Sequence, residues 1–217
     1  MSYLEEDFKE QVGALDLPGF EMQEAIRGFV FVRRKVERTE TIILGYRGYH
    51  GFRLNSPSVH IAFDQVEGPV NRLLEKFAIE RRYGETTITG YCKTNEPIDY
   101  GYRDIEICSR ETFDQVARGL MKVVRLQALP FLEKYQNVAD VGEALKTMSE
   151  DEISKFIVGI VGVKIPLLKK LSRAPDYRDE LARRLKFYSG EVFQYPDYFK
   201  DHDKVFKELF AEDIATL

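Results

Sequence analysis

The apolar residues of this chain change their spacing near Ser109. Between Gly28 and Ser109 they alternate with polar residues in short runs, which is typical of strands. From Arg110 onward they recur every three or four residues, which is typical of helices. Because the strands precede most of the helices instead of alternating with them, the pattern predicts an α+β fold with an antiparallel sheet.

The alternating runs predict about five strands. The short link from Arg38 to Glu40 favours a hairpin between the first two of them. We expect all of the strands to form one antiparallel sheet with helices on one face. The expected strands cover residues 28–37, 41–47, 58–64, 86–93 and 103–108.

One helix signal lies between the expected strands, and the others follow the last of them. Pro69 suits the first position of a helix that runs to Phe77, and Ser109 suits the N-cap of a long helix that kinks or ends at Pro130. Ser149 with Glu152 predicts a capping box. We expect a sheet domain over residues 1–135 and a helical section over 136–217 that packs against it, either as a second domain or as part of the first.

Composition and charge narrow the class of protein. The chain has 217 residues, 44% hydrophobic and 31% charged, which is typical of a soluble globular protein. The net charge of -4 argues against a wholly basic nucleic-acid binder. The most apolar run, residues 156–163, is far shorter than the roughly 20 residues of a membrane helix. We therefore expect a cytoplasmic protein with no membrane partner.

The segment from Gly45 to Arg53 has the most unusual composition, because it interleaves glycines with aromatic and arginine residues. Arginine and tyrosine often anchor protein interfaces, and both can also contact phosphates or bases. We expect the protein to bind a partner through a face of the sheet and this segment; the alternative is a plain connection whose aromatic side chains cover a sheet edge. The candidate binding residues are Arg47, Tyr49, His50 and Arg53.

Two further interpretations remain open. An RNA- or nucleotide-binding module would use the same segment together with Arg81 and Arg82. A hydrolase would use His60 and Asp64, although four residues along a strand separate these two by about 13 Å. The sequence has no metal-ligand or phosphate-loop motif, so we expect neither a metal nor a cofactor.

Two short segments resemble uncharacterised bacterial domains. They are Leu17–Phe20, which precedes a predicted hairpin, and Leu129–Tyr135, which precedes a short predicted helix. Some of these domains are encoded near contact-dependent toxins and are suspected immunity proteins. The resemblance implies a bacterial α+β protein that binds another protein without catalysis. The expected function is therefore that of a non-catalytic, immunity-like binding module.

Overall fold

The computed structural model describes the chain except at residues 1–5, 8–9, 13–14, 16, 26–27, 48–52, 56, 81–84, 93–109 and 195. Its contacts divide the chain into two units. Unit 1 comprises residues 1–61 and 90–134, and unit 2 comprises residues 62–89 and 135–217. The chain therefore passes between the units three times.

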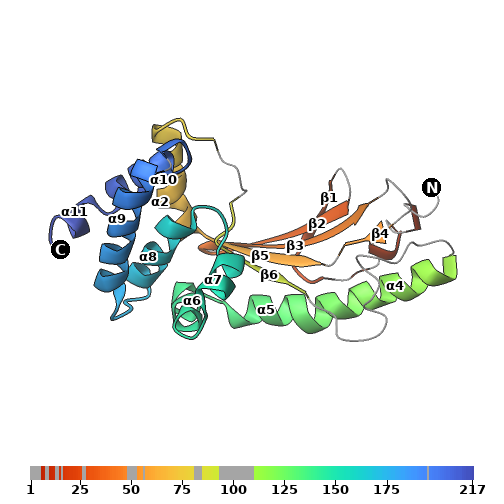
Figure 1. The fold of residues 1–217 in the computed structure, drawn as a ribbon. Helices are drawn as coiled ribbons and strands as arrows, with labels where there is room; N and C mark the ends of the chain where they lie inside the picture. Colours follow the sequence, from red (N-terminus) through yellow and green to blue (C-terminus); the bar gives the residue numbers. More distant parts are fainter. Residues whose placement is uncertain are drawn as a thin grey trace. The chain divides into compact units, whose positions relative to one another are not determined.

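The predicted α+β fold is confirmed: an antiparallel sheet in the N-terminal half precedes a helical C-terminal section (Figure 1). Four of the observed strands correspond to predicted ones, whereas the prediction for residues 103–108 lies outside the described part of the chain. The sheet has the order β1 (Glu21–Ala25), β2 (Gly28–Lys35), β3 (Arg38–Arg47), β5 (Ser58–Phe63) and β6 (Ile88–Tyr91), and β4 (Arg53–Leu54) pairs with β3 beside this path.

The hairpin between β2 and β3 turns earlier than predicted. Lys35 pairs with Arg38, so the turn consists of Val36 and Glu37, and Glu37 adopts a left-handed conformation with φ 64°. The predicted link from Arg38 to Glu40 is wrong, because these residues belong to β3.

Ion pairs explain why this polar run forms a strand. The Glu40 side chain is fully buried and accepts a hydrogen bond from Arg33 Nε at 2.5 Å. The carboxylate of Glu40 also pairs with Arg38 and Lys35. Charge-assisted bonds of this kind compensate the cost of burying a carboxylate, so the polar residues of this run are compatible with a strand.

Strand β1 was not predicted. Its five residues, EMQEA, are all exposed and carry no alternating apolar pattern. It pairs antiparallel with β2, from Glu21 opposite Val32 to Ala25 opposite Gly28. Backbone pairing with its neighbour, and not side-chain burial, therefore accounts for this strand.

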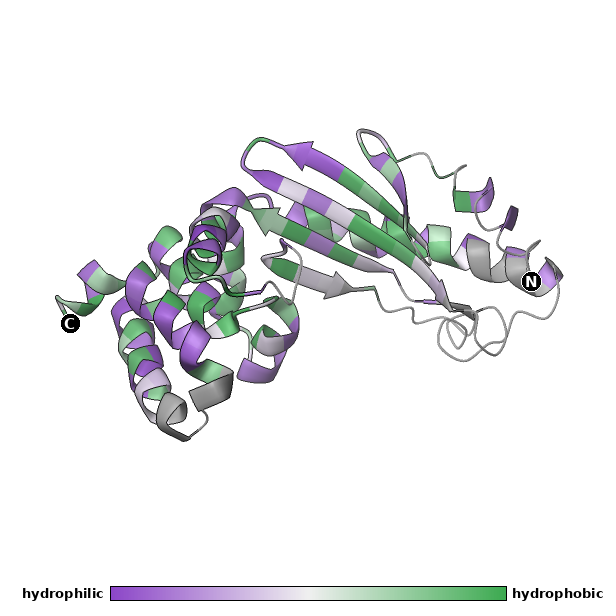
Figure 2. Ribbon diagram, turned by 90° about the horizontal axis from the view of Figure 1, so that it is seen from above, coloured by the Kyte–Doolittle hydropathy of each residue, from purple (hydrophilic) through white to green (hydrophobic). Residues whose placement is uncertain are grey.

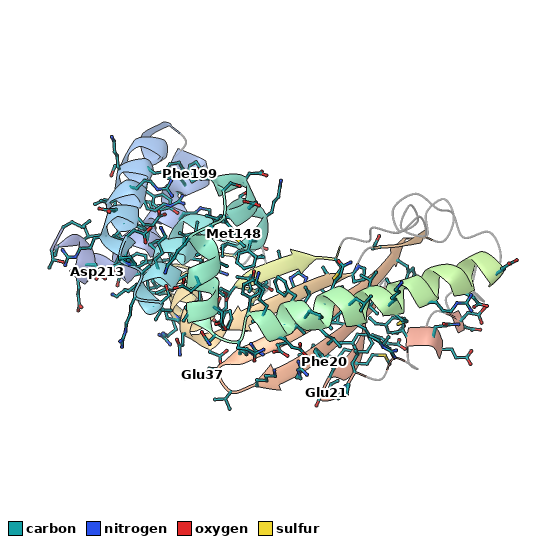
Figure 3. The ribbon with its side chains drawn as sticks, turned by 90° about the horizontal axis from the view of Figure 1, so that it is seen from below. Phe20, Glu21, Glu37, Met148, Phe199 and Asp213 are labelled. Carbon is teal, nitrogen blue, oxygen red and sulfur yellow. The ribbon has the colours of Figure 1, made fainter. Side chains whose placement is uncertain are left out.

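A long helical stretch covers one face of the sheet (Figures 1 and 3). It consists of α4 (Arg110–Val123), a π-helical turn η2 (Val124–Ala128) and α5 (Leu129–Lys134). Every second residue of the central strands faces it, and the buried side chains of both layers form the core of unit 1. These core residues include Phe29, Phe31, Ile42, Leu44, Val59, Ile61, Leu120, Val124, Ala128 and Leu132.

The helix predicted to kink or end at Pro130 does not end there but continues to Lys134. Pro130 has no N–H to donate to the carbonyl of Leu126, four residues earlier, and its ring would crowd that carbonyl in a regular α-helix. The turn before it widens: the N–H of Leu129 bonds to the carbonyl of Val124, five residues earlier. The π-turn thus lets the helix pass through the proline.

Unit 2 contains most of the helices found among the described residues. Aromatic side chains fill its centre, where the rings of Tyr188 and Phe206 lie 5.0 Å apart. The predicted capping box at Ser149 is confirmed, with the Ser149 N–H donating to the Glu152 carboxylate at 2.8 Å. The helices that the structure describes in this unit are α2 (Asp64–Lys76), α6 (Val138–Leu145), α7 (Glu150–Phe156), α8 (Val161–Leu171), α9 (Tyr177–Gln194), α10 (Pro196–Leu209) and α11 (Ala211–Ile214).

Helix α2 begins earlier than predicted. It starts at Asp64, directly after β5, so Pro69 lies inside the helix and not at its first position. The buried stripe of Val66, Val70 and Leu74 spans this longer helix. Burial of the additional Val66 offsets the hydrogen bond that Pro69 cannot donate.

A buried polar network joins α2, α8 and the segment before β6 within unit 2. Lys164 Nζ lies 2.7 Å from Glu67 Oε1 and 2.8 Å from the carbonyl oxygen of Thr86. Thr87 Oγ1 donates to Glu67 Oε1 at 2.7 Å and accepts the Phe63 N–H at 3.1 Å. Burial lowers the pKa of the Lys164 ammonium, and the Glu67 carboxylate opposes that shift. The network therefore holds a charged pair in a core position.

Cys92 is buried, as expected of a small apolar side chain. The residue is 5% exposed, and burial raises the pKa of its thiol to about 11. A thiol of this kind is protonated at neutral pH and therefore a poor nucleophile. Cys108 lies outside the described residues.

Candidate protein-binding face of the sheet

The face of the sheet opposite α4 is not covered by any described helix of unit 1 (Figure 2). Its residues alternate along the strands with those of the core. Val30 pairs with Ile43, and Val32 pairs with Thr41, across β2 and β3. All four of these side chains are β-branched and half-buried. On β5, the side chains of Ser58 and His60 are also half-buried. We call Val30, Val32, Thr41, Ile43, Ser58 and His60 the open face.

The candidate segment from Gly45 to Arg53 lies at one end of this face. Arg47 and Arg53 are register partners in the β3–β4 ladder, and the N–H of Asn55 donates to the carbonyl of Gly45 at 2.8 Å. Arg47 occupies the same alternating set of β3 positions as Thr41 and Ile43. The structure therefore pairs the backbones of Arg47 and Arg53, and it places Arg47 at a β3 position that continues the register of the open face.

The remaining residues of that prediction are not tested by the structure. Tyr49 and His50 lie outside the described residues, and only the backbone is described at Arg47 and Arg53. Arg81 and Arg82, the additional residues of the nucleic-acid interpretation, also lie outside the described part.

His60 and Asp64 do not share a strand. His60 lies on β5, where its Nε2 is 3.0 Å from Ser58 Oγ. Asp64 is instead the exposed first residue of α2, so the prediction that it extends the strand is wrong. Among the described residues no carboxylate bonds to His60, so the acid that would orient a catalytic histidine is missing from this part of the structure.

We expect His60 to stay neutral at pH 7, because burial lowers its pKa from 6.5. As the pH falls below 6.5, the unfolded chain gains a proton at this residue before the folded chain does. The stability associated with neutral His60 is then lost as the pH falls through its folded-state pKa. NMR titration of the imidazole signals, assigned with His60→Gln, checks this, and a folded-state pKa at or above 6.5 would contradict it.

Sequence reasoning missed the apolar residues of the open face. The signal was present, because the run from Gly28 places Phe29 and Phe31 on one side of the strand and Val30 and Val32 on the other. A strand that is apolar on both sides is either buried on both faces or exposes an apolar surface. The sequence alone does not distinguish these two cases.

The described residues contain no group of three or more histidine, cysteine, aspartate or glutamate side chains arranged to hold a metal ion. None of the helices in the described part is both long and apolar enough to cross a membrane. The chain matches no protein-family model, no curated protein and no solved structure.

Proposed function

We propose that this chain is a non-catalytic module that binds another protein through the open face and the segment from Arg47 to Arg53. This is the function that the resemblance to suspected immunity proteins implies. The observation that supports it most directly is the composition of the open face. An antiparallel sheet with one solvated face normally carries polar residues there, whereas this face carries Val30, Val32 and Ile43.

The end of the face adds residues of the kind that anchor interfaces. Arginine and tyrosine are enriched among the side chains whose removal most weakens protein complexes. Here Arg47 and Arg53 are backbone register partners in the β3–β4 ladder, and Tyr49 lies between them in the sequence. An apolar centre with arginines at its border is the usual composition of a protein interface.

A protein partner accounts for these features better than a nucleic acid does. Affinity for RNA or DNA depends mainly on phosphate contacts by basic residues. The open face offers β-branched side chains, and the chain as a whole carries a net charge of -4. Affinity for polynucleotide that falls steeply with salt would support the nucleic-acid interpretation instead.

The test compares apolar-to-threonine substitutions inside and outside the open face, all in the same hairpin. Val30→Thr with Ile43→Thr removes apolar surface from the open face and keeps β-branched residues in the strands. Val36→Thr makes a similar change at the turn, where Val36 is 92% exposed and outside the open face. We expect the first variant to lose about 10–100-fold in affinity for the partner, and Val36→Thr to bind like the wild type.

The partner is first isolated from the native cell with the tagged wild-type chain and identified by mass spectrometry. Its affinity for the purified variants is then measured by calorimetry, alongside their melting temperatures. Arg47→Ala with Tyr49→Ala provides a second disruption, at the end of the face. A partner that binds all variants equally, or a chain that retains no partner, would contradict the proposed function.

A further inference from the structure

A second surface lies on the helical stretch that covers the sheet, on the side away from the strands. Residues of α4 and η2 line a hollow of about 420 Å³ there. The lining combines three basic side chains with two apolar ones: Arg118, Lys122, Arg125, Met121 and Leu126. This surface is separate from the open face, which belongs to the opposite side of the sheet.

The basic residues gather on one side of the helix. Arg118, Lys122 and Arg125 are spaced by four and three residues, which places them next to one another, and all three are exposed. Like charges at these spacings destabilise a helix. Within the part of the chain that the structure describes, Arg118 and Arg125 form no ion pair. The positive charge of these two arginines is therefore available to an external anionic group.

The apolar residues of the hollow are also available. Leu126 lies in the π-turn and is 63% exposed, and Met121 is half-buried beside it. Core residues of the same stretch, such as Val124 and Ala128, are fully buried against the sheet. Leu126 thus contributes apolar surface that the fold of unit 1 does not use. π-Turns inside α-helices frequently occur at functional sites.

We propose that this hollow binds an acidic amphipathic helix of a partner protein. Such a helix places an apolar anchor against Leu126 and Met121 and directs carboxylates to the arginines on either side. The described lining is an exposed strip along one helical stretch, a shape that suits a second helix packed along it. A membrane would require a broader apolar face than two side chains supply.

The test uses the full chain and a fluorescein-labelled peptide of about 15 residues, with leucines on one helical face and glutamates on both sides of them. A second peptide carries glutamine in place of every glutamate. We expect the glutamate peptide to bind at least about 10-fold more tightly than the glutamine peptide, and less tightly as salt increases. Fluorescence anisotropy measures both affinities.

Variants then locate the site. Arg118→Glu with Arg125→Glu is expected to weaken binding of the glutamate peptide at least about 10-fold, and Leu126→Ser to weaken it by a smaller factor. Arg34→Glu with Arg72→Glu makes the same change in net charge at two other exposed arginines and is expected to leave binding unchanged. Melting curves establish that each variant is folded.

Four outcomes would overturn the proposal. The first is no binding of the glutamate peptide at about 1 mM, the weak end of specific affinities. The second is an equal loss of binding in the control variant. The third is that the chain binds phosphatidylglycerol vesicles through Arg118 and Arg125 but does not bind the peptide, because this would assign the surface to a membrane. The fourth is that the wild-type chain is a dimer and the variant with Arg118→Glu and Arg125→Glu is a monomer, since the surface would then bind a second copy of this chain.

Discussion

Lys164→Met is expected to lower the free energy of unfolding by about 3–5 kcal/mol. The substitution nearly preserves the volume of the side chain but removes the ammonium group that lies 2.7 Å from Glu67 Oε1. The Glu67 carboxylate is then left in a buried position with the Thr87 hydroxyl as its remaining described donor. An uncompensated buried charge is among the few causes of so large an effect. Urea denaturation followed by circular dichroism measures it.

Lys155→Met is the matched control for this experiment. Lys155 pairs with Asp151 on α7, and both side chains are largely exposed, at 68% and 72%. Solvent screens such a pair, so we expect a change below about 1 kcal/mol. Glu67→Gln combined with Lys164→Met is expected to regain part of the stability lost in the single variant, because no unpaired charge remains. Equal effects of Lys164→Met and Lys155→Met would show that the buried pair has no special energetic role.

Gly28→Ala is the second substitution with a large expected effect, about 2–6 kcal/mol from backbone strain and overlap together. Gly28 opens β2 with φ 149°, a conformation that side chains with a Cβ rarely adopt. An added Cβ would overlap the carbonyl oxygen of Leu44 and lie 2.8 Å from the Cα of Gly45. Both are backbone atoms of the paired strand, so neither can move without opening the β2–β3 ladder.

Gly190→Ala makes the same chemical change where no such constraint applies. Gly190 lies inside α9, and an added Cβ would meet no atom within 4 Å. Alanine favours a helix over glycine, so this variant is expected to gain about 0.5–1 kcal/mol. Thermal melts of both variants test the pair of predictions. A Gly28→Ala protein as stable as the wild type would contradict the close approach of β2 and β3 at this position.

Alternation of side chains was sufficient to predict the strands that carry the core. Phe29 and Phe31 on β2 and Ile42 and Leu44 on β3 are buried at every second position, so period and burial agree there. The capping box at Ser149 was predictable for a related reason, because its hydrogen bonds join residues only three positions apart. Local signals of both kinds depend little on the rest of the fold.

Elements that depend on distant partners were not predictable in this way. Strand β1 has no apolar pattern and is identified only by its pairing with β2. The polar start of β3 forms a strand because Glu40 pairs with Arg33 on the neighbouring strand. Similarly, the register that places Arg47 opposite Arg53 is a property of the folded ladder. The sequence predicted the segment, and the structure supplied its geometry.

The position of α2 along the chain has a consequence for how the protein forms during translation. Its apolar stripe of Val66, Val70 and Leu74 packs in unit 2, where its helical neighbours are α8 and α10. Those two helices lie about a hundred residues later in the sequence. During translation, the apolar stripe of α2 therefore stays exposed until the chain through Leu209 has left the ribosome. Slow elongation between α2 and α10 would prolong the interval in which chaperones or aggregation compete for that surface.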